Sequence, residues 1–223
     1  MLRDFSWTLP EGRTALLGPN GAGKSTLLGI IAGAIVPTGG TLSIPGANST
    51  RRAYRRAVGW MPQEGETAPH LTVHENVAYF GWLKGMSRGA ARDSAKAAVS
   101  LVGLAEQIGR KARTLSGGQL RRLFLAQALV HSPSLLALDE PSVGLDPAQR
   151  ERLRRVLLGL EGVDILVSTH QVDDIDDLFD TVAVMSRGEL VFTGTVEDFL
   201  KRAPDGPRRA EQAYLTLVPD TDL

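Results

Sequence analysis

Residues 18–26 combine the residue types that could hold a phosphate group beside a metal ion. Their sequence, GPNGAGKST, fits the pattern G-x-x-x-x-G-K-[ST] at Gly18, Gly23, Lys24 and Ser25. Glycines let main-chain N–H groups turn inward, and the start of a following helix attracts an anion. Lys24 could reach the outer phosphates as a point charge, and the Ser25 hydroxyl could enter a Mg²⁺ shell. The alternative is a glycine-rich turn with a solvated lysine.

A second stretch, LLALDE at residues 135–140, places two carboxylates directly after an apolar run. Asp139 is expected to hold Mg²⁺, directly or through water, as an acidic residue does at this place in P-loop proteins. Glu140 is expected to accept a proton from a water that attacks the γ-phosphate in line. A carboxylate pair at a strand end is otherwise a solvated sheet edge. The two stretches together favour a nucleotide site more strongly than either does alone.

Short apolar runs that alternate with helical patterns must position these residues. The runs show little apolar–polar alternation, which predicts strands covered on both faces and therefore an α/β layer with a mainly parallel sheet. Asp146 followed by Pro147 predicts the start of a helix, with Asp146 as its N-cap. The predicted strands cover residues 14–18, 58–62, 135–140 and 164–170.

The chain is expected to form a single domain, residues 1–223, with an insertion. Helical patterns without an intervening strand fill residues 72–133 and predict a helical subdomain inserted into an α/β core of residues 1–71 and 134–200. TVAVM and ELVFTG predict two strands around a tight turn at Gly188. Residues 201–223 form a C-terminal tail, in which DGP breaks the chain before a short helix around AEQAYLTLV.

Composition limits the partners that the chain could have. Twenty-five basic residues balance twenty-five acidic ones, so the charge gives no reason to expect nucleic acid. There is no cysteine, which excludes disulfides, thiolate zinc sites and thiol catalysis. The longest apolar run, residues 27–36, is about half of the roughly 20 residues that cross a bilayer, and the N-terminus does not fit a secretory signal. A cytoplasmic protein is expected.

LSGGQ, residues 115–119, indicates the family. The chain resembles the nucleotide-binding subunit of ATP-binding cassette (ABC) transporters, and the resemblance covers nearly the whole sequence. It implies a P-loop NTPase (RecA-like) core that binds ATP and Mg²⁺. Its elements follow one order: the phosphate loop (Gly18, Pro19, Asn20, Gly21, Ala22, Gly23, Lys24, Ser25 and Thr26), Gln63, LSGGQ, the strand ending at Asp139 and Glu140, SVGLD at 142–146, and His170.

The resemblance also implies roles for the remaining residues. Two subunits, identical or paralogous, would close head to tail around ATP, and the LSGGQ turn of one would face the γ-phosphate held by the other. His170 would orient or sense that phosphate, while Gln63 would ligate Mg²⁺ or water and couple the site to a separately encoded membrane permease. The residues of the turn with this role are Ser116, Gly117, Gly118 and Gln119.

For each of these residues the ordinary interpretation stays open. The Ser-Gly-Gly turn could simply cap a helix, His170 could be a packed or solvated strand-end histidine, and Gln63 could be a polar residue after Pro62. Asp146 could cap its helix as well as contact a partner subunit. No function is assigned to the other histidines.

Two features depart from the family pattern. Only seventeen residues precede Gly18, so the strand whose aromatic residue stacks on adenine is not in view; Phe5 and Trp7 are interpreted instead as strand residues that pack the core. Gly144 stands in SVGLD where the family often has SALD. The leading function is an ATPase that drives a permease, with export favoured by the C-terminal segment. The alternatives are a soluble ABC protein acting on ribosomes or DNA, and a nucleotide-binding regulator without turnover.

Overall fold

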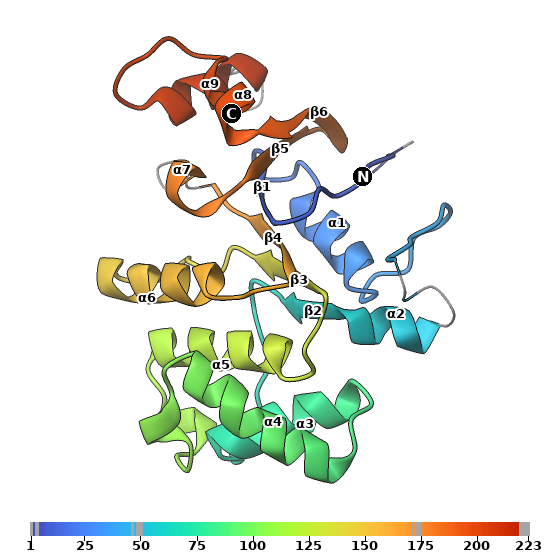
Figure 1. The fold of residues 1–223 in the computed structure, drawn as a ribbon, viewed down its shortest axis with the longest axis vertical. Helices are drawn as coiled ribbons and strands as arrows, with labels where there is room; N and C mark the ends of the chain where they lie inside the picture. The colour runs from blue at the N-terminus through green and yellow to red at the C-terminus, as the bar shows by residue number, and fades with distance from the viewer. Residues whose placement is uncertain are drawn as a thin grey trace.

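The fold is built on one six-stranded sheet with the strand order β2-β3-β4-β1-β5-β6 (Figure 1). The computed structural model describes residues 2, 5–45, 47, 51–170, 172 and 175–218. The strands are β1 (Arg13–Leu17), β2 (Val58–Met61), β3 (Leu135–Asp139), β4 (Asp164–Ser168), β5 (Thr181–Ser186) and β6 (Glu189–Thr195).

The strands β1 to β5 are parallel, and only β6 runs antiparallel, paired with β5. Because parallel strands end at the same edge, the segments that follow β1, β2, β3 and β4 meet at one edge of the sheet. The order places β4 between β1 and β3, with Asp139 opposite Ser168 in the register. This arrangement brings the phosphate loop and the acidic pair together.

Helices cover both faces of the sheet and both ends of the molecule. Figure 1 shows α3, α4 and α5 gathered at one end, and α8 and α9 at the opposite end. In the described part of the chain, no helix is long and apolar enough to cross a membrane. The helices are α1 (Lys24–Ile31), α2 (Arg51–Ala57), α3 (Val73–Leu83), α4 (Arg88–Leu101), α5 (Gly117–Leu129), α6 (Pro147–Leu158), α7 (Ile175–Leu178), α8 (Val196–Leu200) and α9 (Arg209–Leu217), with 3₁₀ turns at Ala105–Gln107 and Ala112–Thr114.

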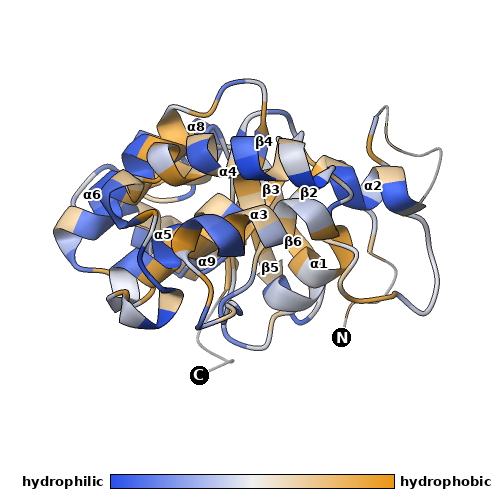
Figure 2. Cartoon of the chain, turned by 90° about the horizontal axis from the view of Figure 1, so that it is seen from below, coloured by the Kyte–Doolittle hydropathy of each residue, from blue (hydrophilic) through white to orange (hydrophobic). Residues whose placement is uncertain are grey.

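The core lies on both faces of the sheet, as the apolar strands predict. In β1, Leu16 joins a buried cluster with Leu27 and Leu28 of α1, whereas Ala15 and Leu17 belong to a second cluster, which also contains residues of α5 and α6. Figure 2 shows the apolar strands at the centre with helices around them. Burial on both faces explains why the strands lack alternation.

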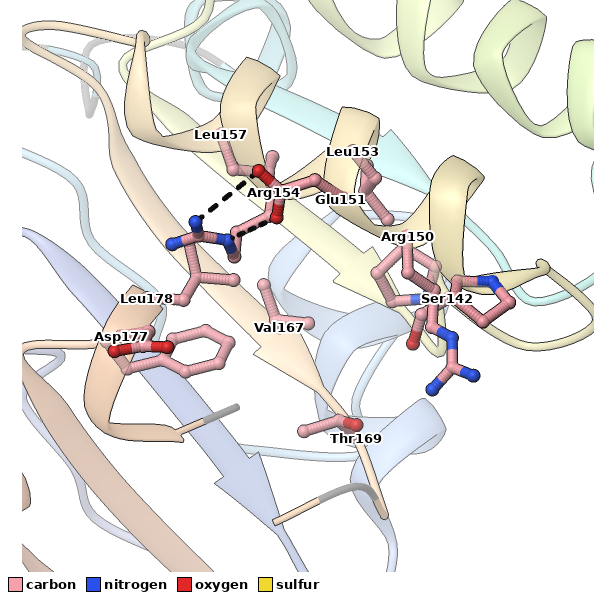
Figure 3. Close-up of a pocket in the computed structure, with 13 residues that line it drawn as sticks. Ser142, Arg150, Glu151, Leu153, Arg154, Leu157, Val167, Thr169, Asp177 and Leu178 are labelled. Carbon is pink, nitrogen blue, oxygen red and sulfur yellow. Dashed lines mark hydrogen bonds and ion pairs between the residues drawn. The ribbon is translucent and has the colours of Figure 1, made fainter. Parts of the chain in front are cut away.

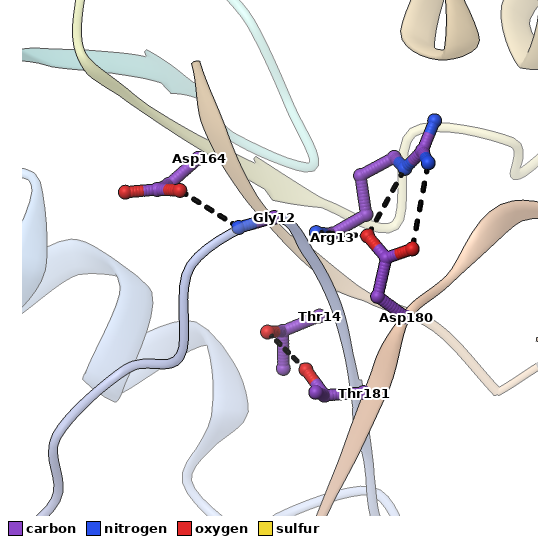
Figure 4. A network of polar contacts seen from close by, with 6 residues as sticks. All are labelled: Gly12, Arg13, Thr14, Asp164, Asp180 and Thr181. Carbon is purple, nitrogen blue, oxygen red and sulfur yellow. Dashed lines mark hydrogen bonds and ion pairs between the residues drawn. The ribbon is translucent and has the colours of Figure 1, made fainter. Parts of the chain in front are cut away.

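Polar contacts fix the start of β1 against its two neighbours (Figure 4). The Gly12 N–H donates to Asp164 Oδ1 at 2.8 Å, and the Arg13 N–H donates to Asp180 Oδ2 at 2.8 Å. The Arg13 side chain also pairs with Asp180. These contacts fix the register of β1 relative to β4 and β5. They thereby position the phosphate loop, which follows the other end of β1.

The predicted α/β class, the mainly parallel sheet and the antiparallel pair at Gly188 are confirmed. The interpretation of Phe5 and Trp7 as strand residues is wrong: residues 5–12 form no strand. Both rings still pack on the α1 side of the core. The helix α2 was not predicted. The division into core, helical subdomain and tail stays a prediction, and its first residue and residues 219–223 lie outside the described residues.

Candidate functional site

A cavity of about 710 Å³ opens where the parallel strands end. This volume lies within the roughly 300–1,000 Å³ typical of ligand sites. It collects twelve of the seventeen site residues predicted from the sequence, although they lie at the ends of four different strands. Its walls include Gly18, Pro19, Asn20, Gly21, Gly23, Lys24, Ser25, Thr26, Gln63, Asp139, Glu140, Val143, Thr169, His170, Val172 and Tyr214.

The phosphate loop depends on glycine at two positions. Gly18 has φ 154°, and a Cβ there would lie 2.4 Å from the Met185 carbonyl oxygen, so the loop passes against β5 too closely for a side chain. Gly23, with φ 104°, is the left-handed residue from which α1 begins. Ala22 does not line the cavity; its side chain is buried in the α1 side of the core.

Lys24 lies inside the loop that it follows. Its ammonium donates to the carbonyl oxygens of Gly18 at 2.6 Å and Pro19 at 3.1 Å, and the residue is only 7% exposed. Burial lowers the pKa of Lys24, while the nearby carboxylates of Glu140 and Asp139 act in the opposite direction. A buried cation held by carbonyl dipoles favours an anion in the same cavity.

Ser168, at the end of β4, connects the two acidic residues at the end of β3. Its hydroxyl donates to Asp139 Oδ1 at 2.5 Å and accepts from the Glu140 N–H at 2.9 Å. Ser168 is fully buried, and Asp139 and Glu140 are 3% and 8% exposed. One buried hydroxyl therefore orients Asp139 and fixes the backbone at Glu140.

Glu140 and His170 contact each other at the cavity wall. Nδ1 of His170 lies 2.9 Å from Oε2 of Glu140, while the histidine side chain is 61% exposed. Glu140 has φ 47°, a strained backbone conformation for a residue with a side chain, and such strain clusters at functional sites. The carboxylate is thus positioned at the cavity wall with Oε2 on the imidazole.

Gln63 follows β2 in an exposed loop and lines the cavity. Its backbone carbonyl accepts a hydrogen bond from the guanidinium of Arg121 on α5. The loop is therefore connected to the helix that starts at the LSGGQ turn.

Ser116 caps α5, and the turn does not line the cavity of its own chain. The Ser116 hydroxyl accepts from the Gln119 N–H at 3.3 Å, and the Gln119 side chain accepts from the Ser116 N–H at 3.0 Å. A Cβ on Gly118 would lie 1.5 Å from Oε1 of Gln149, so α6 packs against this turn. Asp146 caps α6, as predicted, and its contact with a partner subunit stays a prediction.

The donor set suits Mg²⁺. Ser25, Asp139 and Gln63 line the same cavity and offer hydroxyl, carboxylate and amide oxygens, the hard ligands that Mg²⁺ prefers. Within the described residues there is no cluster of three or more histidine and acidic side chains that could bind a metal by themselves. This agrees with a metal that takes most of its ligands from phosphate and water.

The comparisons with known proteins identify the family. The model of the family described as "ABC transporter" matches residues 2–143. The chain belongs to this ABC family. The resemblance drawn from the motifs is confirmed.

Relatives and solved structures agree with this assignment. The chain is 34% identical over 208 residues to a linearmycin resistance ATP-binding protein of Bacillus subtilis, covering 91% of this chain and 67% of that protein. It is 40% identical over 201 residues to a Nod factor export ATP-binding protein of Burkholderia lata, covering 87% and 66%. A dimeric bacterial ABC transporter cassette superposes with a TM-score of 0.76 at 27% identity, covering 87% and 90%.

The chain spans 58–67% of the length of its first curated relatives. The P-loop NTPase class is confirmed by the solved cassettes, one of which is a post-hydrolysis state bound to ADP and Pi, at 26% identity and a TM-score of 0.76. The two relatives are named for linearmycin resistance and for Nod factor export, and neither name supports the alternative function on ribosomes or DNA.

Two residues of the site were missed from the sequence. Ser168 was recognisable only as the polar last residue of an apolar strand, two positions before His170. Tyr214 lines the cavity from α9, and no sequence signal connected the C-terminal helix with the phosphate loop. Both depend on tertiary pairing.

Proposed function

We propose that this chain binds ATP with Mg²⁺, hydrolyses the γ-phosphate and, as a dimer with an identical or paralogous cassette, drives export through a separate membrane permease. The observation that carries this proposal is the single cavity that unites Lys24, the acidic pair and His170. A cassette that only bound nucleotide, without hydrolysing it, would not need all four of these side chains.

The phosphate loop supplies binding. Main-chain N–H groups at the start of α1 would contact the β-phosphate, and Lys24 would exchange its two carbonyl partners for phosphate oxygens. Bound Mg²⁺ would neutralise charge on the β- and γ-phosphates, and Ser25, Asp139 and Gln63 would hold it. Low exposure of Lys24 makes its charge more effective than it would be in water.

Glu140 supplies the base. The water that attacks the γ-phosphate loses a proton to the carboxylate as the bond to the leaving ADP breaks. His170 holds one carboxylate oxygen through Nδ1 and leaves Nε2 available to the γ-phosphate. The buried hydroxyl of Ser168 fixes the backbone from which Glu140 projects.

A second cassette and a permease complete the proposal. The LSGGQ turn lies outside the cavity of its own chain, so only another molecule could bring such a turn to the γ-phosphate. Exposed aromatic and apolar side chains on α3, namely Tyr79, Trp82 and Leu83, support a protein partner on that helix. Through the permease, the chain would lie at the inner face of the cell membrane.

The first experiment is Glu140→Gln. It should lower ATP turnover by about 10²- to 10⁴-fold, the usual effect of losing a general base, while leaving the Kd for ATP nearly unchanged. Glu161→Gln, an exposed carboxylate remote from the cavity, is the matched control. Equal turnover in Glu140→Gln and the control would exclude Glu140 as the base.

The partner is tested separately. Tagged chain purified from gently solubilised membranes should bring with it an integral membrane protein. If no integral membrane protein co-purifies with the tagged chain, the transport proposal is contradicted. The ATPase proposal is not affected by that result.

A further inference from the structure

A second cavity, of about 330 Å³, lies next to the nucleotide cavity, near the carboxyl ends of β3 and β4 (Figure 3). It is open to solvent on one side and lined by residues of α6, α7 and the carboxyl end of β4. Its walls include Pro141 and Ser142, which directly follow Glu140, and Thr169, which directly precedes His170. The cavity is therefore separate from the nucleotide site but adjacent to both of its proposed catalytic side chains.

Among the charged residues that line this cavity, Arg150 has a buried side-chain donor without a partner. Its Nε is buried, and within the described part of the chain it has no hydrogen-bond partner; the guanidinium forms no ion pair there either. The two arginines one turn further along α6 differ, because Arg154 and Arg155 both pair with Glu151, at 2.8 and 2.7 Å. Leaving a desolvated donor unpaired costs free energy, which an anionic ligand would recover.

The rest of the lining is mixed: Ser142, Thr169 and the ion pair between Glu151 and Arg154 are polar, and the other side chains apart from Asp177 are apolar. Leu153 and Leu157 of α6, Val167 of β4, and Leu178 and Phe179 at α7 form the wall beside Arg150.

Asp177 also lines the cavity, but its exposed carboxylate lies on the far side of Val167 from the Arg150 guanidinium, as Figure 3 shows. It therefore leaves Arg150 uncompensated. A cavity with one unpaired cation and an apolar wall suits a ligand with a charged end and a hydrocarbon body.

We propose that this cavity binds a small amphipathic carboxylate, with the acid group on Arg150 and the hydrocarbon chain against Leu153, Leu157, Val167 and Phe179. The volume admits a short acyl chain and excludes the two-chain lipids of a membrane. The cavity shares only Thr169 with the lining of the nucleotide cavity, so its ligand can be tested without nucleotide.

Octanoate is the probe, titrated into the full chain by calorimetry without nucleotide. Saturable binding is expected for the wild type, and Arg150→Gln should weaken it about ten- to a hundredfold, as expected for losing a charge-assisted hydrogen bond. Arg155→Gln is the matched control: it removes the same charge from the same helix, outside the cavity, and should bind octanoate like the wild type. Octylamine and octanol, which lack the negative charge, should bind much more weakly.

Leu178→Trp, which fills the cavity from α7, should abolish binding while Arg150 remains in place. If this variant does not fold, the comparison of Arg150→Gln with Arg155→Gln decides alone. The proposal is overturned if the wild type shows no saturable binding, if Arg150→Gln binds octanoate as well as Arg155→Gln does, or if octanol and octylamine bind equally well. Because nucleotide is absent, none of these outcomes bears on ATP hydrolysis.

Discussion

Ser168→Ala tests whether one buried hydroxyl organises the acidic pair. The substitution removes the 2.5 Å hydrogen bond to Asp139 Oδ1 between two residues that are 0% and 3% exposed. Hydrogen bonds to charged groups contribute about 1.5–3 kcal/mol, and alanine leaves almost no cavity here. The Glu140 N–H loses the hydroxyl but keeps the Ser168 carbonyl oxygen at 3.1 Å, so it adds little to the loss.

The free energy of unfolding should therefore fall by about 2 kcal/mol, which corresponds to a decrease in Tm of roughly 4–8 °C for a domain of this size. ATP turnover should fall about tenfold, because Asp139 and Glu140 lose the group that orients them, while ATP binding changes little. Urea unfolding measures the first quantity and steady-state phosphate release the second.

Ser134→Ala is the matched control. Its hydroxyl is exposed and donates to the Ala57 carbonyl oxygen at 3.3 Å, so its loss should cost less than about 0.5 kcal/mol. If Ser168→Ala unfolded at the same urea concentration as Ser134→Ala and hydrolysed ATP at the wild-type rate, the organising role of Ser168 would be refuted.

Three further predictions concern the loop and a buried histidine. Lys24→Ala should raise the Kd for ATP by at least about tenfold in equilibrium dialysis, because a phosphate-directed charge is lost. Gly18→Ala should abolish ATP binding, because its Cβ would lie 2.4 Å from a carbonyl oxygen of β5, whereas Gly21→Ala, with nothing within 4 Å, should cost only about 1–2 kcal/mol of backbone strain. Burial, with a smaller effect of a nearby lysine, lowers the pKa of His131 to about 4, so the free energy of unfolding should fall between pH 6.5 and pH 4, by at most about 3 kcal/mol.

The sign of the pH effect follows from which state binds the proton. Below pH 6.5 the imidazole of the unfolded chain becomes protonated, while the buried His131 stays neutral until about pH 4. His131→Gln should remove that part of the pH dependence in urea unfolding; an identical pH profile would show that the histidine does not cause it. Wild-type ATP affinity in Lys24→Ala, or tight ATP binding by Gly18→Ala, would contradict the geometry assigned to the phosphate loop.

Much of the site was predictable because its residues follow apolar strands. A strand buried on both faces is an uninterrupted apolar run, so the polar residues at its end are conspicuous, as Asp139 and His170 are. The loop at Gly18 could be predicted for a different reason, since its spacing is set by local backbone geometry. Neither inference required knowledge of which strands are neighbours.

Some of the features that were missed depend on such knowledge, whereas α2 was missed for a local reason. Ser168 acts through the register of β4 on β3, which connects residues 29 positions apart. The sequence RRAYRRA of α2 has too few apolar residues to show a helical period. Phe5 and Trp7 have apolar side chains suited to a strand, but residues 5–12 pair with no strand of the sheet, and side-chain type alone does not decide such pairing.

The helix α5 gives the proposed dimer a physical route to the permease. The turn at its start is held in place by the reciprocal hydrogen bonds between Ser116 and Gln119. About one turn further along the same helix, Arg121 holds the backbone of the Gln63 loop, which lines the cavity and leads towards α3. A helix transmits displacement along its axis with little deformation. A nucleotide that draws in the LSGGQ turn of one chain would therefore also shift the Gln63 loop of that chain, beside the exposed side chains of α3 on which we place the permease.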